Sequence, residues 1–154
     1  MTKKLLAIFN WFALLIMLTA NTLANALPIN GYNTGQISAF YPNLFVPDGF
    51  TFSIWSVIYL LLIGFVVIST KWLWYREDTD AGQLAAQIAP LFMTTCLLNA
   101  GWILAWHYLQ VNVSVIIMLG FLGMLIYIYL KLQPYRTLLS PFQKLFLYIP
   151  FVVY

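Results

Sequence analysis

Charged side chains are scarce in this sequence. The chain of 154 residues contains seven Lys or Arg and four Asp or Glu, so only 7% of it is charged, whereas a soluble domain carries about 25%. So few charges do not cover a water-soluble surface of this size. The composition therefore excludes a soluble enzyme, a disordered chain and a typical nucleic-acid-binding protein.

Cysteine and histidine are also nearly absent. The single cysteine, Cys96, excludes an intrachain disulfide and a thiol metal cluster. The single histidine, His107, has no second His, Cys or carboxylate at a metal-ligand spacing. The apolar runs contain no Ser-His-Asp set, no carboxylate pair and no glycine-rich phosphate loop. We therefore expect no enzymatic activity, no metal site and no resident cofactor.

Long apolar runs fill most of the chain, which is 63% hydrophobic with a mean hydropathy of +0.88. A spanning helix needs about 20 mainly apolar residues, and lipid tolerates only backbone whose hydrogen bonds are satisfied internally. The sequence therefore predicts an all-α, polytopic membrane helix bundle that forms one transmembrane domain over residues 1–154. The predicted helices cover about residues 5–27, 50–75, 84–109, 111–130 and 144–154.

The fifth predicted helix is incomplete. Residues 144–154 supply about 16 Å of helix, about half of the hydrocarbon thickness of about 30 Å. The simplest interpretation is a chain truncated at its C-terminus, and the alternative is a re-entrant stub.

Basic residues predict the topology. With the N-terminus in the cytoplasm, all seven fall on the cytoplasmic side, while the loop of residues 28–46 and the turn near Gln110 carry none. This asymmetry follows the positive-inside rule. We therefore expect an integral protein of a bacterial cytoplasmic membrane, with its N-terminus inside and loop 28–46 outside.

The first apolar run has a second interpretation. Lys3 and Lys4, an apolar stretch and the sequence Ala24-Asn25-Ala26 together imitate a cleavable secretory signal. The run is long for a signal and carries several asparagines, which favours a retained helix. In both cases the following loop lies outside.

Three asparagines in this first helix, Asn10, Asn21 and Asn25, fall on one face at 100° per residue. Polar side chains in the membrane are costly unless they are paired, so this face is expected to point at other helices. Hydrogen bonding between helices is the favoured interpretation, and ligand contact is the alternative.

Aromatic side chains gather on two further faces. The second helix carries Phe52, Trp55 and Tyr59 on one face, and the third carries Asn99 and Trp102. Two such faces can line a cleft for a flat apolar ligand with polar edges, or they can simply fill the bundle. By contrast, the cluster of Trp72, Trp74 and Tyr75 adjoins the cytoplasmic charges and is expected to form an interfacial belt.

Two segments resemble the TspO/MBR family, the tryptophan-rich sensory or translocator proteins. The sequence PDGFTFSIWSVIY at residues 47–59 is similar to the start of that family's second helix, and LNAGW at residues 98–102 is similar to a motif of its third. The five-span plan agrees as well, over about residues 5–154. The resemblance identifies the chain as a divergent, C-terminally truncated relative.

The resemblance implies a five-helix bundle, often a homodimer, that binds a small hydrophobic ligand such as a porphyrin under its first loop. Its pocket candidates here are Phe52, Trp55, Tyr59, Asn99 and Trp102. We thus expect a sensory, binding or carrier protein whose partners are the lipid bilayer, a flat ligand with a tetrapyrrole as the example, and a second copy, but not nucleic acid. The alternatives are a transporter or permease subunit and a structural membrane partner.

Overall fold

The computed structural model describes residues 2–27, 29–40, 53–75 and 79–154. In these residues the chain is helical and contains no strand, so the predicted all-α membrane bundle is confirmed. Four helices are long and apolar enough to cross a membrane. They are α1 (Lys3–Ala26), α3 (Ile54–Tyr75), α4 (Asp80–His107) and α5 (Val111–Leu132).

The observed start of α4 differs from the predicted one. The helix begins at Asp80, four residues before the predicted position, because Thr79 caps it: the Thr79 hydroxyl accepts a hydrogen bond from the Gly82 amide at 3.2 Å. The Asp80 carboxylate then lies in the first turn, where the helix dipole favours a negative charge. A hydropathy pattern alone does not detect such a polar first turn.

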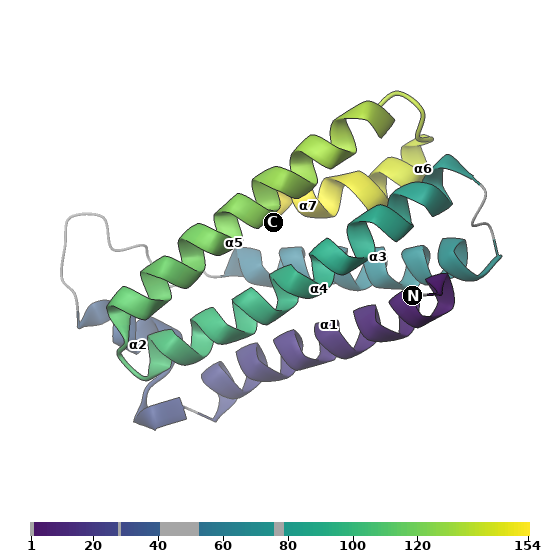
Figure 1. Cartoon of the computed structure of the whole chain (residues 1–154). Coiled ribbons are helices and arrows are strands. Elements are labelled where there is room, and N and C mark those ends of the chain that lie inside the picture. Colours follow the sequence, from purple (N-terminus) through teal and green to yellow (C-terminus); the bar gives the residue numbers. More distant parts are fainter. Residues whose placement is uncertain (1, 28, 41–52, 76–78) are drawn as a thin grey trace.

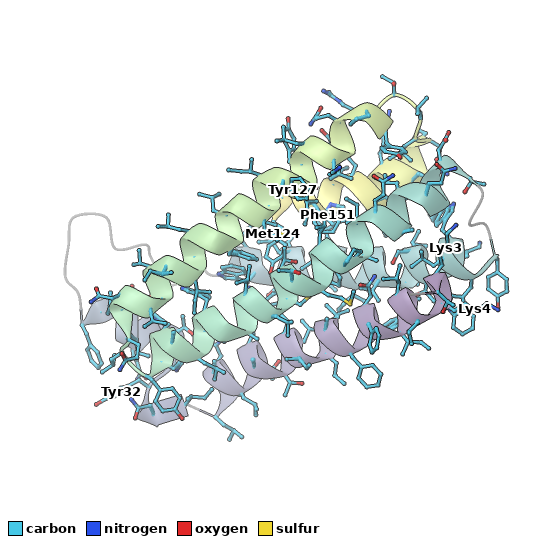
Figure 2. The ribbon with its side chains drawn as sticks, viewed as in Figure 1. Lys3, Lys4, Tyr32, Met124, Tyr127 and Phe151 are labelled. Atoms are coloured by element: carbon cyan, nitrogen blue, oxygen red, sulfur yellow. The ribbon has the colours of Figure 1, made fainter. Side chains whose placement is uncertain are left out.

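The four long helices run side by side, with α1 packed mainly against α4 and α3, and α4 packed against α5 (Figure 1). The N-terminus lies at the same end of the bundle as α6 and the start of α4, and α2 lies at the opposite end. Figure 2 places Lys3 and Lys4 at the first end and Tyr32 at the second. We call these the basic end and the loop end.

The C-terminal segment is a short helical run, from Pro141 to Val153, that is too short to span a membrane. It consists of α6 (Pro141–Gln143), a π-helical turn (η4, Lys144–Tyr148) and α7 (Ile149–Val153). It starts three residues before the predicted fifth helix because Ser140 and Gln143 form a capping box. The segment packs against α3 and α5.

The middle of the bundle is closely packed and apolar. Phe65, Phe92 and Phe151 are buried and come from α3, α4 and α7. The Phe65 ring centroid lies 5.0 Å from that of Phe92 and 4.9 Å from that of Phe151. Trp72, which was expected to be an interfacial belt residue, instead belongs to this core with 8% of its surface exposed. That expectation was wrong because Trp72 lies on the face of α3 that meets the other helices.

The predicted outer loop contains local structure. A 3-10 turn (η1, Ile29–Gly31) is followed by α2 (Thr34–Ala39). Asn30 and Gly31 both have positive φ, +58° and +86°, a conformation that asparagine and glycine adopt most readily. These residues turn the chain so that α2 packs against α4.

Candidate ligand-binding site

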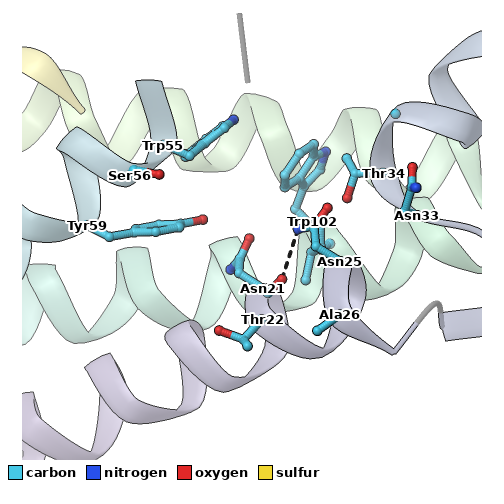
Figure 3. A pocket seen from close by; sticks show the side chains of 12 residues that line it. Asn21, Thr22, Asn25, Ala26, Asn33, Thr34, Trp55, Ser56, Tyr59 and Trp102 are labelled. Carbon is cyan, nitrogen blue, oxygen red and sulfur yellow. Dashed lines mark hydrogen bonds between the residues drawn. The ribbon is translucent and has the colours of Figure 1, made fainter. Parts of the chain in front are cut away.

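A cavity of about 700 Å³ opens at the loop end, where α1, α2, α3 and α4 meet (Figure 3). Each of the four elements contributes to its lining. The volume falls in the range of small-molecule sites, about 300–1,000 Å³. The lining residues are Asn21, Thr22, Asn25, Ala26, Asn33, Thr34, Gly35, Trp55, Ser56, Tyr59, Trp102 and Ile103.

One wall of this cavity is aromatic. The Trp55 and Trp102 rings stack at a centroid distance of 6.2 Å and an angle of 24°, and the Trp55 and Tyr59 rings lie 5.9 Å apart at 32°. Trp55 and Tyr59 are adjacent because they are four residues apart on one helix. Both centroid distances lie in the range of aromatic pairs, about 4.5–7 Å, so the three rings form one aromatic surface. A ligand would contact the free surfaces of the rings that face α1 and α2.

The opposite wall is built from amides of α1. The Asn21 amide nitrogen donates to the Asn99 side-chain oxygen at 2.6 Å and to the Met17 carbonyl at 2.9 Å. The Asn25 amide nitrogen donates to the Asn21 carbonyl at 3.0 Å. Asn21 therefore fits both interpretations of the asparagine face, hydrogen bonding between helices and ligand contact, because it bonds to Asn99 of α4 and also lines the cavity.

A third wall comes from α2, which His107 holds against the end of α4. His107 is fully buried. Its Nε2 lies 3.1 Å from the Thr34 hydroxyl and its Nδ1 lies 3.3 Å from the Ile29 carbonyl, while the Asn30 side chain donates to the His107 carbonyl at 3.2 Å. The Ile29 carbonyl can only accept, so Nδ1 donates to it, and Nε2 pairs with the Thr34 hydroxyl. The single histidine thus fastens the loop through hydrogen bonds.

The five predicted site residues separate into three groups. Trp55, Tyr59 and Trp102 line the cavity. Asn99 does not line it but lies behind Asn21, with 1% of its surface exposed. Phe52 lies outside the described residues. Asn99 therefore positions a lining amide instead of facing the cavity itself.

Sequence reasoning did not find the contribution of α2. Asn33 and Gln36 form a capping box, in which each side chain accepts from the other residue's amide at 2.9 Å, and this box orders the first turn of α2. An Asn followed three residues later by Gln is a readable signal for a helix start. That signal would have placed Asn33 and Thr34 on a helix in the predicted loop.

The cavity lining contains no charged side chain among the described residues. Its polar groups are amides and hydroxyls, and the basic residues of the described chain lie on the helices toward the basic end. Such a site favours uncharged polar groups, because an ionised group brought into it would lose hydration without gaining an ion pair.

The comparisons with known proteins agree with this architecture. The model of a family described as TSPO-like protein matches residues 7–154. No match was found among the curated proteins or among the solved structures.

Proposed function

Because this chain belongs to the TSPO-like protein family, we propose that it is a membrane protein that binds a flat, mainly apolar ligand, such as a porphyrin, as a sensor or carrier. The observation that supports this proposal is the loop-end cavity, with its aromatic wall of Trp55, Tyr59 and Trp102 facing the amides of α1. We propose a binding role and not catalysis, since the described residues of the lining include no pair of acid and base groups.

The aromatic wall and the amide wall contribute differently to ligand binding. Stacking and edge contacts with the aromatic wall contribute affinity for a planar ring system, about 0.5–1.5 kcal/mol for each aromatic pair. Asn21 and Asn25 contribute orientation, because their amides can bond to a polar edge of the ligand. Asn99 assists by holding the Asn21 side chain at 2.6 Å.

The uncharged lining makes a further distinction between ligands. A porphyrin with two carboxylates would have to leave them in water at the cavity mouth, whereas its dimethyl ester could enter fully. We therefore expect the ester to bind at least as tightly as the free acid.

Tryptophan fluorescence of the detergent-purified protein, titrated with protoporphyrin and with its dimethyl ester, tests the proposal. We expect saturable quenching that is weakened about tenfold or more, about 1.4 kcal/mol, by Trp102→Leu or Trp55→Leu. Trp74→Leu is the matched control, because Trp74 lies near the basic end, where its ring meets Lys4. Quenching that never saturates, or that is equally weak in all three variants, would contradict the proposal.

Sensing and carrying are separated by a flux measurement. A carrier moves the ligand between the two faces of a reconstituted vesicle, and a sensor does not. With the positive-inside orientation that we propose, the cavity opens on the outer side of a bacterial cytoplasmic membrane and the N-terminus lies in the cytoplasm. Protease access to residues 29–40 in oriented vesicles tests that orientation.

A further inference from the structure

A second hollow, of about 640 Å³, lies at the basic end between α4 and α5. We call it the basic-end groove. It is separate from the loop-end cavity, and the two share no lining residue. Its lining residues are Asp80, Gln83, Gln87, Tyr127, Leu130, Lys131, Pro134, Tyr135 and Leu138.

Helix spacing explains why these side chains meet. Asp80, Gln83 and Gln87 follow one face of α4 at intervals of three and four residues, and Tyr127, Leu130 and Lys131 do the same on α5. The two faces are tied at the end of α5, where the Gln87 amide donates to the Tyr135 hydroxyl at 2.9 Å.

The groove lies at the depth of lipid headgroups. Helix α4 has 28 residues and is therefore about 42 Å long, longer than the hydrocarbon thickness of about 30 Å. Charged residues avoid the hydrocarbon, so Asp80 and Lys131 indicate the headgroup level. Tyr127 lies one helical turn deeper and Leu130 faces the lipid with 59% of its surface exposed.

The groove contains one charge of each sign, on Asp80 and Lys131. The Lys131 ammonium lies 5.5 Å from the Tyr127 ring centroid. In the part of the chain that the structure describes, Asp80 and Lys131 make no ion pair with each other or with another residue. A ligand that carries a phosphate and an ammonium would match both.

We propose that the basic-end groove binds the headgroup of a phospholipid that carries a primary amine, as phosphatidylethanolamine does. Lys131 receives the phosphate, and the side-chain oxygens of Asp80 and Gln83 accept hydrogen bonds from the ammonium. The acyl chains continue along Leu130 and the lipid-facing side of α5.

Two other headgroup classes fit less well. An anionic headgroup would bring a net negative charge to the Asp80 carboxylate, and like charges repel. A choline headgroup has no N–H to donate to Asp80 and Gln83, and it is bound best by aromatic cages. In this groove the Tyr127 ring already faces the Lys131 ammonium.

Native mass spectrometry of the full chain in detergent, with equal amounts of ethanolamine, glycerol and choline phospholipids of the same acyl chains, tests the proposal. We expect the wild type to retain the ethanolamine lipid about tenfold more than the other two. Asp80→Asn should remove the preference over the glycerol lipid, because the repelling carboxylate is gone. Lys131→Gln should weaken retention of all three, and Lys131→Arg should restore it.

Lys144→Gln is the control, because Lys144 lies near the same end but outside the groove. Equal or greater retention of the glycerol lipid by the wild type would overturn the proposal in favour of an anionic-lipid site. Absence of lipid retention, or a preference that survives Asp80→Asn, would also overturn it. The wild-type lipid ratio keeps the proposal testable even if a variant fails to fold.

Discussion

The loop end and the middle of the bundle use the same kinds of residue in opposite ways. At the loop end Trp55 and Trp102 stack beside an open cavity, and Asn21 has two hydrogen-bond acceptors. In the middle Phe92 is fully buried between other rings, and Asn10 is fully buried while neither of its side-chain polar atoms has a partner among the described residues. Aromatic and amide side chains thus form a binding surface where packing is incomplete and a buried core where it is complete.

The difference predicts that truncation affects stability in the middle and binding at the loop end. Phe92→Ala removes a ring that packs against Phe65 and Phe151. In a membrane the unfolded helices remain in lipid, so the loss of stability comes mainly from the cavity that the missing ring leaves. A cavity of roughly 100 Å³ at about 24 cal/mol per Å³ lowers the free energy of unfolding by about 2 kcal/mol. Trp102→Ala, in the cavity wall, should cost clearly less. Thermal unfolding in detergent measures both, and equal losses would show that the loop end is packed as tightly as the middle.

Close packing in the middle also depends on a glycine. A Cβ atom added to Gly64 would lie 2.7 Å from the Phe146 ring, whereas a Cβ added to Gly120 would meet nothing within 4 Å. Overpacking costs about 1–3 kcal/mol, and the better helix propensity of alanine returns about 1 kcal/mol. Gly64→Ala should therefore destabilise the protein by about 1 kcal/mol, and Gly120→Ala should not.

The matched glycine pair is measured by thermal unfolding under one detergent condition. A stability of Gly64→Ala equal to that of Gly120→Ala would mean that the Phe146 ring moves aside at no cost, and that the C-terminal segment is loosely attached to α3.

Asn10 and Asn21 of α1 allow the same comparison between the middle and the loop end to be made with polar side chains. Leucine has the same number and branching of side-chain heavy atoms as asparagine, so Asn10→Leu removes two polar atoms that have no partner among the described residues and leaves no cavity. We expect it to stabilise the protein by about 1 kcal/mol. Asn21→Leu should destabilise it, since Asn99 then loses its donor. Destabilisation by Asn10→Leu would instead reveal a polar partner for Asn10, such as an internal water.

The sequence predicted the spans because bilayer thickness imposes a length on every apolar helix. Helical spacing also placed Trp55 and Tyr59 on one face of α3, and the family resemblance added Trp102 of α4 to the candidate pocket. It did not reveal that Asn21 stands in front of Asn99, since the rotation of α1 against α4 depends on packing over the whole interface. The burial of His107 and Trp72 could not be predicted from the sequence for the same reason, because it too depends on how the helices are rotated against one another.

His107 gives the finest test, because its ring bonds the segment of residues 29–39 to the end of α4. Thr34→Val removes the hydroxyl that bonds to His107 Nε2 and nearly preserves the side-chain shape. Such a bond contributes about 0.5–1.5 kcal/mol, and local segments open independently of the whole protein. Hydrogen exchange at the amides of residues 29–39 should therefore accelerate about threefold to tenfold, while the unfolding temperature stays the same.

Thr94→Val is the control, since the Thr94 hydroxyl bonds only within its own helix, to the Pro90 carbonyl. Unchanged exchange in Thr34→Val would mean that packing of α2 against α4, and not His107, closes the loop end.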